Sequence, residues 1–150
     1  MTTIRDLRAE DRSDWNGLWA GYLHFYRGEA EVTPEITEQT FSLMTEQRDG
    51  CFGLAAEADD GTVVGLAHCI LHPTTWSLGP TCYLEDLFVA PGQRGSGAAK
   101  ALIEAAGERA RAQGSELLYW HTQAFNGRAR SLYDTVASLT SFVHYERSLG

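Results

Sequence analysis

Residues 83–122 read as a strand, a turn, a helix and a second strand, and this order restricts the fold more than any other feature. The apolar segment 83–89 (YLEDLFV) is followed by a helix predicted from about Gly97 to Gln113. Residues 116–122 (ELLYWHT) are then predicted to form a strand. A helix of this length between two strands is typical of a βαβ crossover, which makes the strands parallel. We therefore expect an α/β fold with a mixed sheet.

The remaining elements complete one domain, residues 1–150. Asp59-Asp60-Gly61 predicts the turn of an antiparallel hairpin, and Thr33-Pro34 predicts the start of a helix. Ser13 or Asp14 can cap a first helix. The expected strands are 3–8, 51–58, 62–72 and 141–149, and the expected helices are one from residue 13 or 14, one over 34–47 and one over 127–137.

Charge and cysteine usage exclude several classes of function. The chain has 12 Lys and Arg against 20 Asp and Glu, a net charge of −8, which argues against a nucleic-acid surface. Its three cysteines have no CxxC spacing, and no His, Cys and Asp pattern predicts a metal. The sequence shows no signal peptide and no run long enough to span a membrane. We expect a cytoplasmic protein.

The first helix carries a broad aromatic face, which has two interpretations. The residues recur at three- and four-residue spacing, as core positions do. Alternatively, the end of the helix, around residues 24–27, lines a substrate pocket. The residues of this face are Trp15, Leu18, Trp19, Tyr22, Phe25 and Tyr26.

The turn between the strand 83–89 and the next helix is suited to holding an anion. Its sequence, APGQRGSGAA, lies where the carboxyl end of a strand meets a helix N-terminus, and ligands of open α/β sheets bind there. The free N–H groups and the dipole of the helix N-terminus attract an anion, and Arg94 adds a positive charge. Gly95 and Gly97 let the anion approach the backbone closely. The turn matches neither of two common phosphate-binding motifs. Ala98 stands where a phosphate loop needs lysine, and Lys100 stands where a dinucleotide motif needs a small residue.

Three ordered motifs resemble the GNAT superfamily of acetyl-CoA-dependent N-acetyltransferases. RGSGAA (94–99) has the R-G-x-G-x-A form of its pyrophosphate loop, YLEDLFV precedes it, and NGRARSLY (126–133) matches N-x-x-A-x-x-L-Y. Within the superfamily the motifs look most like the spermidine/spermine and small-amine N-acetyltransferases. The chain has DTVASLTSF (134–142) where members often have a Gly-Phe pair.

This resemblance implies a mixed twisted sheet with a splay between two parallel strands, and acetyl-CoA held at that splay. Backbone groups of the strand would bond the pantetheine arm, and an N–H of Leu87 would polarise the acetyl carbonyl. A bulky residue such as Val at Gly97 is expected to weaken CoA binding with little loss of stability. The implied cofactor-binding residues are Leu87, Phe88, Val89, Arg94, Gly95, Ser96, Gly97, Ala98, Ala99 and Asn126.

The same resemblance assigns Tyr133 as the general acid that protonates the departing thiolate. An amine arrives protonated at pH 7, so a base or cation anchor is also needed. Glu85 and Asp86 are adjacent in a strand and are expected to point to opposite faces, so only one can face the pocket. We favour Glu85, with His121 as the alternative base.

The leading hypothesis is an enzyme that acetylates a primary amine of a small cationic molecule or a protein lysine. The alternative is an acyl-CoA-binding module without turnover, and Tyr133 favours catalysis because a binding module needs no proton donor. His68 and His144 are expected to be structural. The resemblance and the last strand suggest a homodimer.

Overall fold

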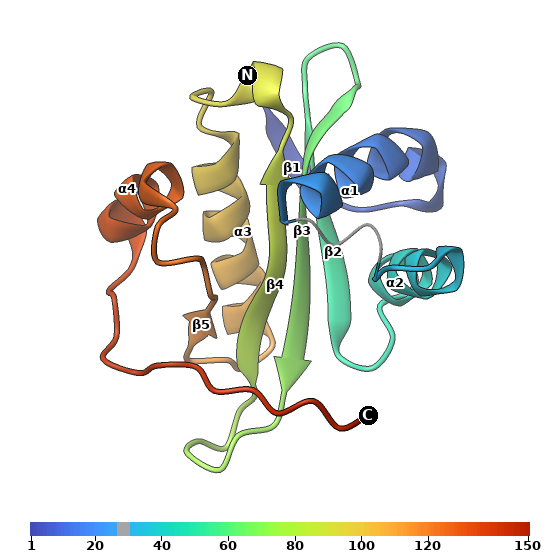
Figure 1. Ribbon diagram of the computed structural model, residues 1–150. Coiled ribbons are helices and arrows are strands. Elements are labelled where there is room, and N and C mark those ends of the chain that lie inside the picture. Colours follow the sequence, from blue (N-terminus) through green and yellow to red (C-terminus); the bar gives the residue numbers. More distant parts are fainter. Residues whose placement is uncertain (27–30) are drawn as a thin grey trace.

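The computed structural model describes residues 1–26 and 31–150. Within these residues five strands form one sheet in the order β1-β2-β3-β4-β5 (Figure 1). Pairing is antiparallel from β1 to β4, whereas β4 and β5 are parallel. The strands are β1 (Thr3–Asp6), β2 (Cys51–Glu57), β3 (Val63–His72), β4 (Thr81–Val89) and β5 (Leu118–Tyr119). The predicted α/β fold and its parallel pair are confirmed.

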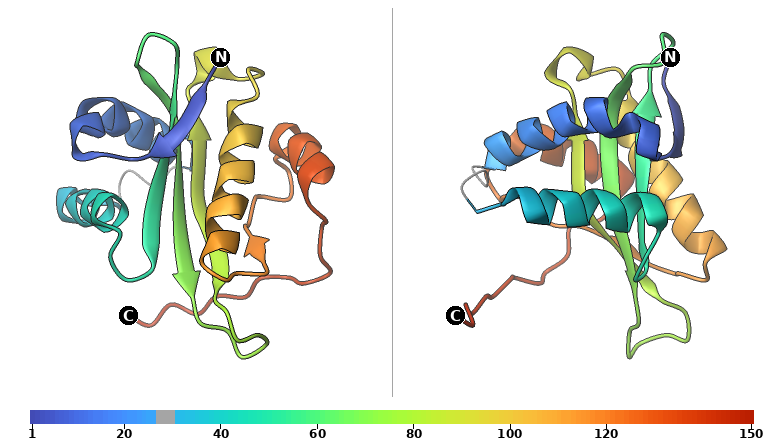
Figure 2. Two further views of the ribbon diagram at one scale, coloured as in Figure 1. Left: turned by 180° about the vertical axis from the view of Figure 1, so that it is seen from behind. Right: turned by 90° about the vertical axis from the view of Figure 1, so that its right-hand side faces the viewer.

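Helices cover both faces of the sheet (Figure 2). One face packs against α1 (Arg12–Tyr26) and α2 (Pro34–Glu46), around the buried Trp15. The other packs against α3 (Ala98–Ala112) and α4 (Gly127–Val136), around Leu102. Among the helices described, none is long and apolar enough to cross a membrane.

The predicted helix and turn signals are confirmed at three places and wrong at one. The hydroxyl of Thr33 accepts from the N–H of Ile36 and caps α2, and Gly61 adopts φ +88° in the β2–β3 turn. Gly114, with φ +86°, follows the end of α3. Helix α1, however, begins at Arg12, and Asp14 does not cap it. The Asp14 carboxylate instead accepts from the N–H of Val63 (3.0 Å) and fastens α1 to the sheet.

A β-bulge in β4 changes the direction of the two carboxylates. His68 pairs with Asp86, but the next residue, Cys69, pairs with Leu84, so Glu85 is the extra residue on β4. A bulge interrupts the two-residue alternation of side chains. Leu84 and Leu87 both pack in the core under α3, so the two residues between them are directed toward the α1 face, where Asp86 contacts His68. The expectation that the two carboxylates point to opposite faces of the sheet was therefore wrong.

The strand predicted over residues 141–149 does not form. Residues 137–150 are exposed, and no strand or helix is assigned to them. After α4 the chain instead crosses below the lower ends of β4 and β3 (Figure 1). A strand requires a neighbouring edge for its backbone groups, and this path gives the segment none.

An ion pair joins β1 to the start of α1 and allows a stability prediction. Both carboxylate oxygens of Asp11 accept from Arg5 (2.8 and 2.9 Å), and one also accepts from the N–H of Arg8. Burial alone would raise the pKa of Asp11, but the bonds from Arg5 and Arg8 outweigh burial and lower it.

We expect Asp11→Asn to lower the free energy of unfolding by about 1.5–3 kcal/mol at pH 7, because bonds to a charged partner are lost. The Asp11 pKa is depressed on folding, so its contribution is present above the ordinary value of 3.8 and is lost as pH falls through the folded pKa. Urea unfolding of both proteins at several pH values should show the difference shrinking below pH 3.8. The exposed Asp59→Asn is the control, and an equal effect from it would contradict the role of burial.

Candidate active site

The turn between β4 and α3 presents backbone N–H groups at the start of a helix. Gly95 and Gly97 have φ of +86° and +87°, and Gly97 caps α3. The N–H of Ala101 donates to the oxygen of Gly97, so the N–H groups of residues 98–100 lie before the helical hydrogen-bond ladder. Free N–H groups at a helix N-terminus, together with the helix dipole, favour the binding of an anion.

The space around these glycines is open. A Cβ placed on Gly95 or Gly97 would meet no heavy atom of the described residues within 4 Å. Ser96 is exposed between them, whereas Ala98 is buried in the core under α3 and Ala99 is partly buried. An incoming ligand can therefore approach the backbone of this turn closely.

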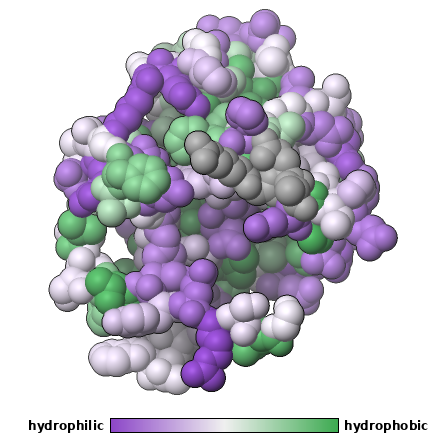
Figure 3. Space-filling model, viewed as in Figure 1, coloured by the Kyte–Doolittle hydropathy of each residue, from purple (hydrophilic) through white to green (hydrophobic). Residues whose placement is uncertain are grey.

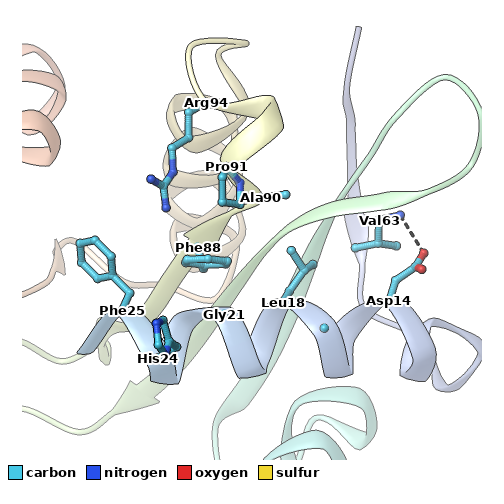
Figure 4. Close-up of a pocket in the computed structure, with 11 residues that line it drawn as sticks. Asp14, Leu18, Gly21, His24, Phe25, Val63, Phe88, Ala90, Pro91 and Arg94 are labelled. Atoms are coloured by element: carbon cyan, nitrogen blue, oxygen red, sulfur yellow. Dashed lines mark hydrogen bonds between the residues drawn. The ribbon is translucent and has the colours of Figure 1, made fainter. Parts of the chain in front are cut away.

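Arg94 extends from the same turn toward α1. Its guanidinium lies 6.0 Å from the ring of Phe25 and 5.8 Å from that of Phe88. It lines a largely apolar pocket of about 440 Å³ between α1 and the end of β4, together with His24 (Figure 4). Trp15, Leu18 and Trp19 of the aromatic face pack in the core, as the first interpretation had it. His24 and Phe25 line this pocket, and its use by a substrate stays a prediction. Arg27 lies outside the described residues.

The parallel strands β4 and β5 separate soon after they meet. Cys82 pairs with Leu118 and Tyr83 with Tyr119, and β5 ends there. The N–H of Ala90 donates to Val64 on β3 (2.8 Å), and alternate residues of a strand point their backbone groups to opposite edges.

The backbone groups of Leu87 and Val89 therefore face the side where β5 has ended. Those of Phe88 face β3 instead, and its side chain is buried against α1. Three strand residues were expected to contact the cofactor. Leu87 and Val89 direct their backbone groups toward the gap beyond the end of β5, whereas Phe88 does not.

Asp86 belongs to a buried hydrogen-bonded chain on the α1 face. The indole of Trp15 donates to Nε2 of His68 (3.0 Å), because an indole nitrogen can only donate. The proton of neutral His68 is then on Nδ1 and is donated to Asp86 (2.9 Å). Burial first and Asp86 second raise the pKa of Tyr22, which also lies against this carboxylate. His68 is fully buried, which agrees with the structural role expected of it.

Glu85 lies at one end of a second chain that leads outward. The Tyr83 hydroxyl interacts with Glu85 and lies 3.0 Å from Nδ1 of the exposed His121. Partial burial first, and the charge of Asp86 second, raise the pKa of Glu85. The two residues weighed as alternative bases, Glu85 and His121, are thus connected through Tyr83.

Tyr133 lies on α4 beside the separated strands. Its ring packs edge-on against Trp120 at 5.4 Å, just past the end of β5. Burial first and nearby Tyr26 second raise the pKa of Tyr133 to about 12. The hydroxyl therefore keeps its proton at neutral pH, as a general acid must.

Asn126 positions this helix. Its Oδ1 accepts from the N–H of Ala129 (3.5 Å) as the N-cap of α4, and its Nδ2 donates to Thr122 (3.4 Å). Tyr26 lies against both Thr122 and Asn126. The Asn126 side chain is therefore engaged in holding α4 against the chain after β5 and against α1.

Comparison with known proteins places these features in a family. Residues 6–136 match the Acetyltransferase (GNAT) family. The chain is a GNAT acetyltransferase. The D-amino-acid N-acetyltransferase of Saccharomyces cerevisiae is 32% identical to it over 146 residues, covering 97% of this chain and 89% of that protein.

Solved structures share the fold of this GNAT acetyltransferase over its whole length. An aminoglycoside N-acetyltransferase in complex with CoA aligns with a TM-score of 0.83 and 21% identity, covering 100% of this chain and 96% of the other. The ribosomal-protein-alanine N-acetyltransferase of Brucella melitensis aligns with a TM-score of 0.78 and 22% identity, covering 99% and 100%.

Two residues around the GNAT site, Tyr83 and Tyr22, were missed as site residues by sequence reasoning. Tyr83 stands two residues before Glu85, and this spacing in a strand could have indicated a shared face. Tyr22 was identified only as a member of an aromatic face, whereas Tyr26 falls within the segment 24–27 that was considered as a pocket lining. The contacts of Tyr22 with Asp86 and of Tyr26 with Asn126 join segments far apart in the sequence. Within residues 1–26 and 31–150, no group of three or more His, Cys, Asp or Glu side chains is placed to hold a metal.

Proposed function

We propose that this enzyme moves the acetyl group of acetyl-CoA directly onto a primary amine of a small cationic molecule. The observation that carries the proposal is the unpaired edge of β4 at Leu87 and Val89, which lies between the anion-binding turn and Tyr133. Acetyl-CoA supplies an activated thioester and an anionic pyrophosphate. The turn and the strand edge match these two parts.

The roles of the cofactor-binding residues follow from their placement. The N–H groups of Gly95, Gly97, Ala98 and Ala99 hold the pyrophosphate, and Arg94 adds positive charge beside it. The N–H of Ser96 donates to the carbonyl of Gln93 within the turn (3.2 Å). The backbones of Leu87 and Val89 pair with the pantetheine amides, and the N–H of Leu87 faces the acetyl oxygen. Phe88 supports this strand from the α1 face, and Asn126 fixes α4.

Glu85, Tyr83 and His121 form the path by which the amine loses its proton. Glu85 accepts a proton from the ammonium group, and the Tyr83 hydroxyl accepts it from Glu85 while donating its own to Nδ1 of His121. His121 is exposed and releases a proton to solvent from Nε2. The neutral amine then attacks the acetyl carbon, and Tyr133 protonates the leaving sulfur as the carbon–sulfur bond breaks. The proton that the nitrogen loses as the amide forms restores the Tyr133 hydroxyl.

Carboxylates and aromatic rings favour a cationic acceptor. The bulge places Glu85 and Asp86 on the α1 face, and Trp19, Tyr22 and Tyr26 pack in a row along α1. Such rings attract an ammonium group and pack on its alkyl chain. The named activity of the yeast relative supports an amino-acid-like acceptor over a polyamine-like one or a protein lysine.

We also propose a cellular compartment and an oligomeric state for the enzyme. The cysteines are all unpaired and buried, which suits a reducing, cytoplasmic compartment. We also propose a homodimer, because a row of apolar side chains near the C-terminus is exposed.

A thiol-release assay tests the function. The protein is incubated with acetyl-CoA and, separately, with D- and L-amino acids, polyamines, aminoglycosides and lysine peptides. We expect amine-dependent release of CoA, with the fastest turnover for a small cationic acceptor. CoA binding by calorimetry without turnover on any amine would instead support the alternative, an acyl-CoA-binding module.

A substitution at Gly97 tests the pyrophosphate site. Valine there would also strain the backbone at φ +87°, so the expectation of little loss of stability does not hold for that variant. Gly97→Asn is the better choice, because Asn tolerates this conformation and its side chain would enter the ligand's space. We expect CoA affinity to fall about tenfold or more, the order of one bond to a charged group.

Calorimetry with CoA measures this affinity, and thermal unfolding checks the fold. Gly61→Asn is the control, because Gly61 has φ +88° and similar open space but lies in the β2–β3 turn. Unchanged CoA affinity in Gly97→Asn would exclude this turn as the binding site.

A further inference from the structure

The ring of Tyr119, the last residue of β5, lies against the ring of Tyr83. The two ring centres are 4.8 Å apart and the ring planes are inclined by 28°, which is a stacked arrangement. The same two residues form the last pair between the parallel strands β4 and β5. Tyr119 therefore lies where these strands begin to separate, beside the tyrosine that connects Glu85 to His121.

The hydroxyl of Tyr119 donates a hydrogen bond to His72. Nδ1 of His72 lies 2.8 Å from the carbonyl oxygen of Pro73, which can only accept, so Nδ1 carries the proton of the neutral ring. Nε2 then has a free lone pair and accepts from the Tyr119 hydroxyl at 2.8 Å. Burial first, and the charge of Glu85 second, raise the pKa of Tyr119, so its hydroxyl keeps the proton that it donates.

This hydrogen bond joins two strands that are not neighbours in the sheet. His72 is the last residue of β3 and Tyr119 is the last residue of β5, and β4 lies between these strands. β5 is only two residues long, so few backbone hydrogen bonds hold its end in place. The side-chain bond from His72 reaches across β4 and holds the end of β5 where backbone pairing stops.

The rings of His72, Tyr83 and Tyr119 lie on the α1 face of the sheet, the same side as Glu85. A neighbour of each ring in its own strand packs in the core under α3, and successive side chains of a strand point to opposite faces. Figure 3 shows mainly hydrophilic side chains over the middle of the molecule, where β4 runs in Figure 1, so a proton released there can reach water. The three neighbours are Leu71, Cys82 and Leu118.

We propose that His72 and Tyr119 are positioning residues for Tyr83. The bond to His72 fixes the Tyr119 ring, and this ring fixes the ring of Tyr83 stacked on it. The Tyr83 hydroxyl thereby stays between Glu85 and His121. A group that relays a proton must lie within about 2.6–3.2 Å of both of its partners, so a small rotation of its ring interrupts the relay. This inference rests on the proposed proton path and adds the residues that hold it in place.

Tyr119→Phe tests the proposal, because it removes the bond to His72 and keeps a ring for stacking. We expect kcat to fall about tenfold and by no more than about 10²-fold, the cost of a misplacement of about 1 Å. In a Tyr83→Phe background the same change should cause no further loss, because no hydroxyl is left to position. Equal losses in both backgrounds would mean a merely structural role and would overturn the proposal.

Two substitutions of His72 form a matched pair. Glutamine places an oxygen at about the distance of Nε2 and can accept from the Tyr119 hydroxyl, whereas leucine cannot. His72→Gln should therefore keep most of the parent kcat, and His72→Leu should lose as much as Tyr119→Phe. Equal losses in the two His72 variants would exclude this hydrogen bond as the source of the effect.

The nitrogen NMR shifts of the His121 ring give a test that needs no turnover. The Tyr83 hydroxyl lies 3.0 Å from Nδ1 of His121, and the shift of this nitrogen reports its hydrogen bond. Tyr119→Phe should move the shift in the same direction as Tyr83→Phe, and His72→Gln should leave it in place. An unmoved shift in Tyr119→Phe would overturn the proposal.

The two measurements separate this inference from the proposed function. If the His121 shift moves in Tyr119→Phe while kcat is unchanged in both Tyr119→Phe and Tyr83→Phe, the positioning of Tyr83 is supported and the proton path through it is wrong. If Tyr83→Phe lowers kcat and Tyr119→Phe changes neither kcat nor the shift, the path stands and the positioning role is wrong.

Discussion

Tyr133→Phe is expected to lower kcat about 10²–10⁴-fold, the usual contribution of general acid catalysis. The phenylalanine ring keeps the packing against Trp120 and removes the hydroxyl alone. The affinity for acetyl-CoA, measured by calorimetry, should stay nearly unchanged. Because the pKa of Tyr133 is about 12, the hydroxyl is protonated over the whole neutral range, and the variant should not move an alkaline limb of the pH profile below pH 10.

Tyr145→Phe is the matched control, because it removes the hydroxyl of a residue that is 89% exposed in the segment after α4. It should leave kcat unchanged. A loss under about threefold in Tyr133→Phe, far below the range for general acid catalysis, would show that the thiolate leaves without this proton.

Local sequence was enough to predict most of the fold. Thr33 and Pro34 lie next to each other at the start of α2, and Asp59-Asp60-Gly61 specifies its own turn. The turn at Gly95 and Gly97 before α3 likewise depends on a few adjacent residues. Its place at the carboxyl end of β4 follows from the crossover that joins the parallel strands β4 and β5. Such features are set by backbone preferences over short distances.

The features that were missed depend on contacts between distant segments. The bulge at Glu85 arises from the pairing of β4 with β3, and no residue type in LEDLF predicts it. The side chain of Arg94 turns toward Phe25, which lies about seventy residues earlier in the chain. The strand predicted over 141–149 has a partial alternation but no neighbouring strand among residues 1–26 and 31–150. A pattern of side chains does not specify which edge the backbone will use.

Glu85→Gln should reveal how the amine loses its proton. The variant keeps the shape of the side chain and removes its charge and its ability to accept a proton. If Glu85 begins the path through Tyr83 to His121, kcat should fall about 10²–10⁴-fold. The parent rate should decrease as pH falls through the Glu85 pKa, which lies above the ordinary 4.5 because the carboxyl is partly buried and close to Asp86. This acidic limb should vanish in the variant.

Tyr83→Phe and Glu108→Gln complete the experiment. Tyr83→Phe breaks the path but keeps Glu85, so kcat should fall less than in Glu85→Gln and the acidic limb should remain. Glu108→Gln, at an exposed position on α3, controls for the loss of one negative charge. A rise in the KM for the amine with kcat and the limb unchanged would make Glu85 an anchor for the cation and not its base. If Glu85→Gln acetylated every amine as well as the parent, both roles would be wrong, yet CoA binding at the glycine turn would be unaffected. Asp86, which is hydrogen-bonded to His68 on the same face, would then be the next residue to change as an anchor for the amine.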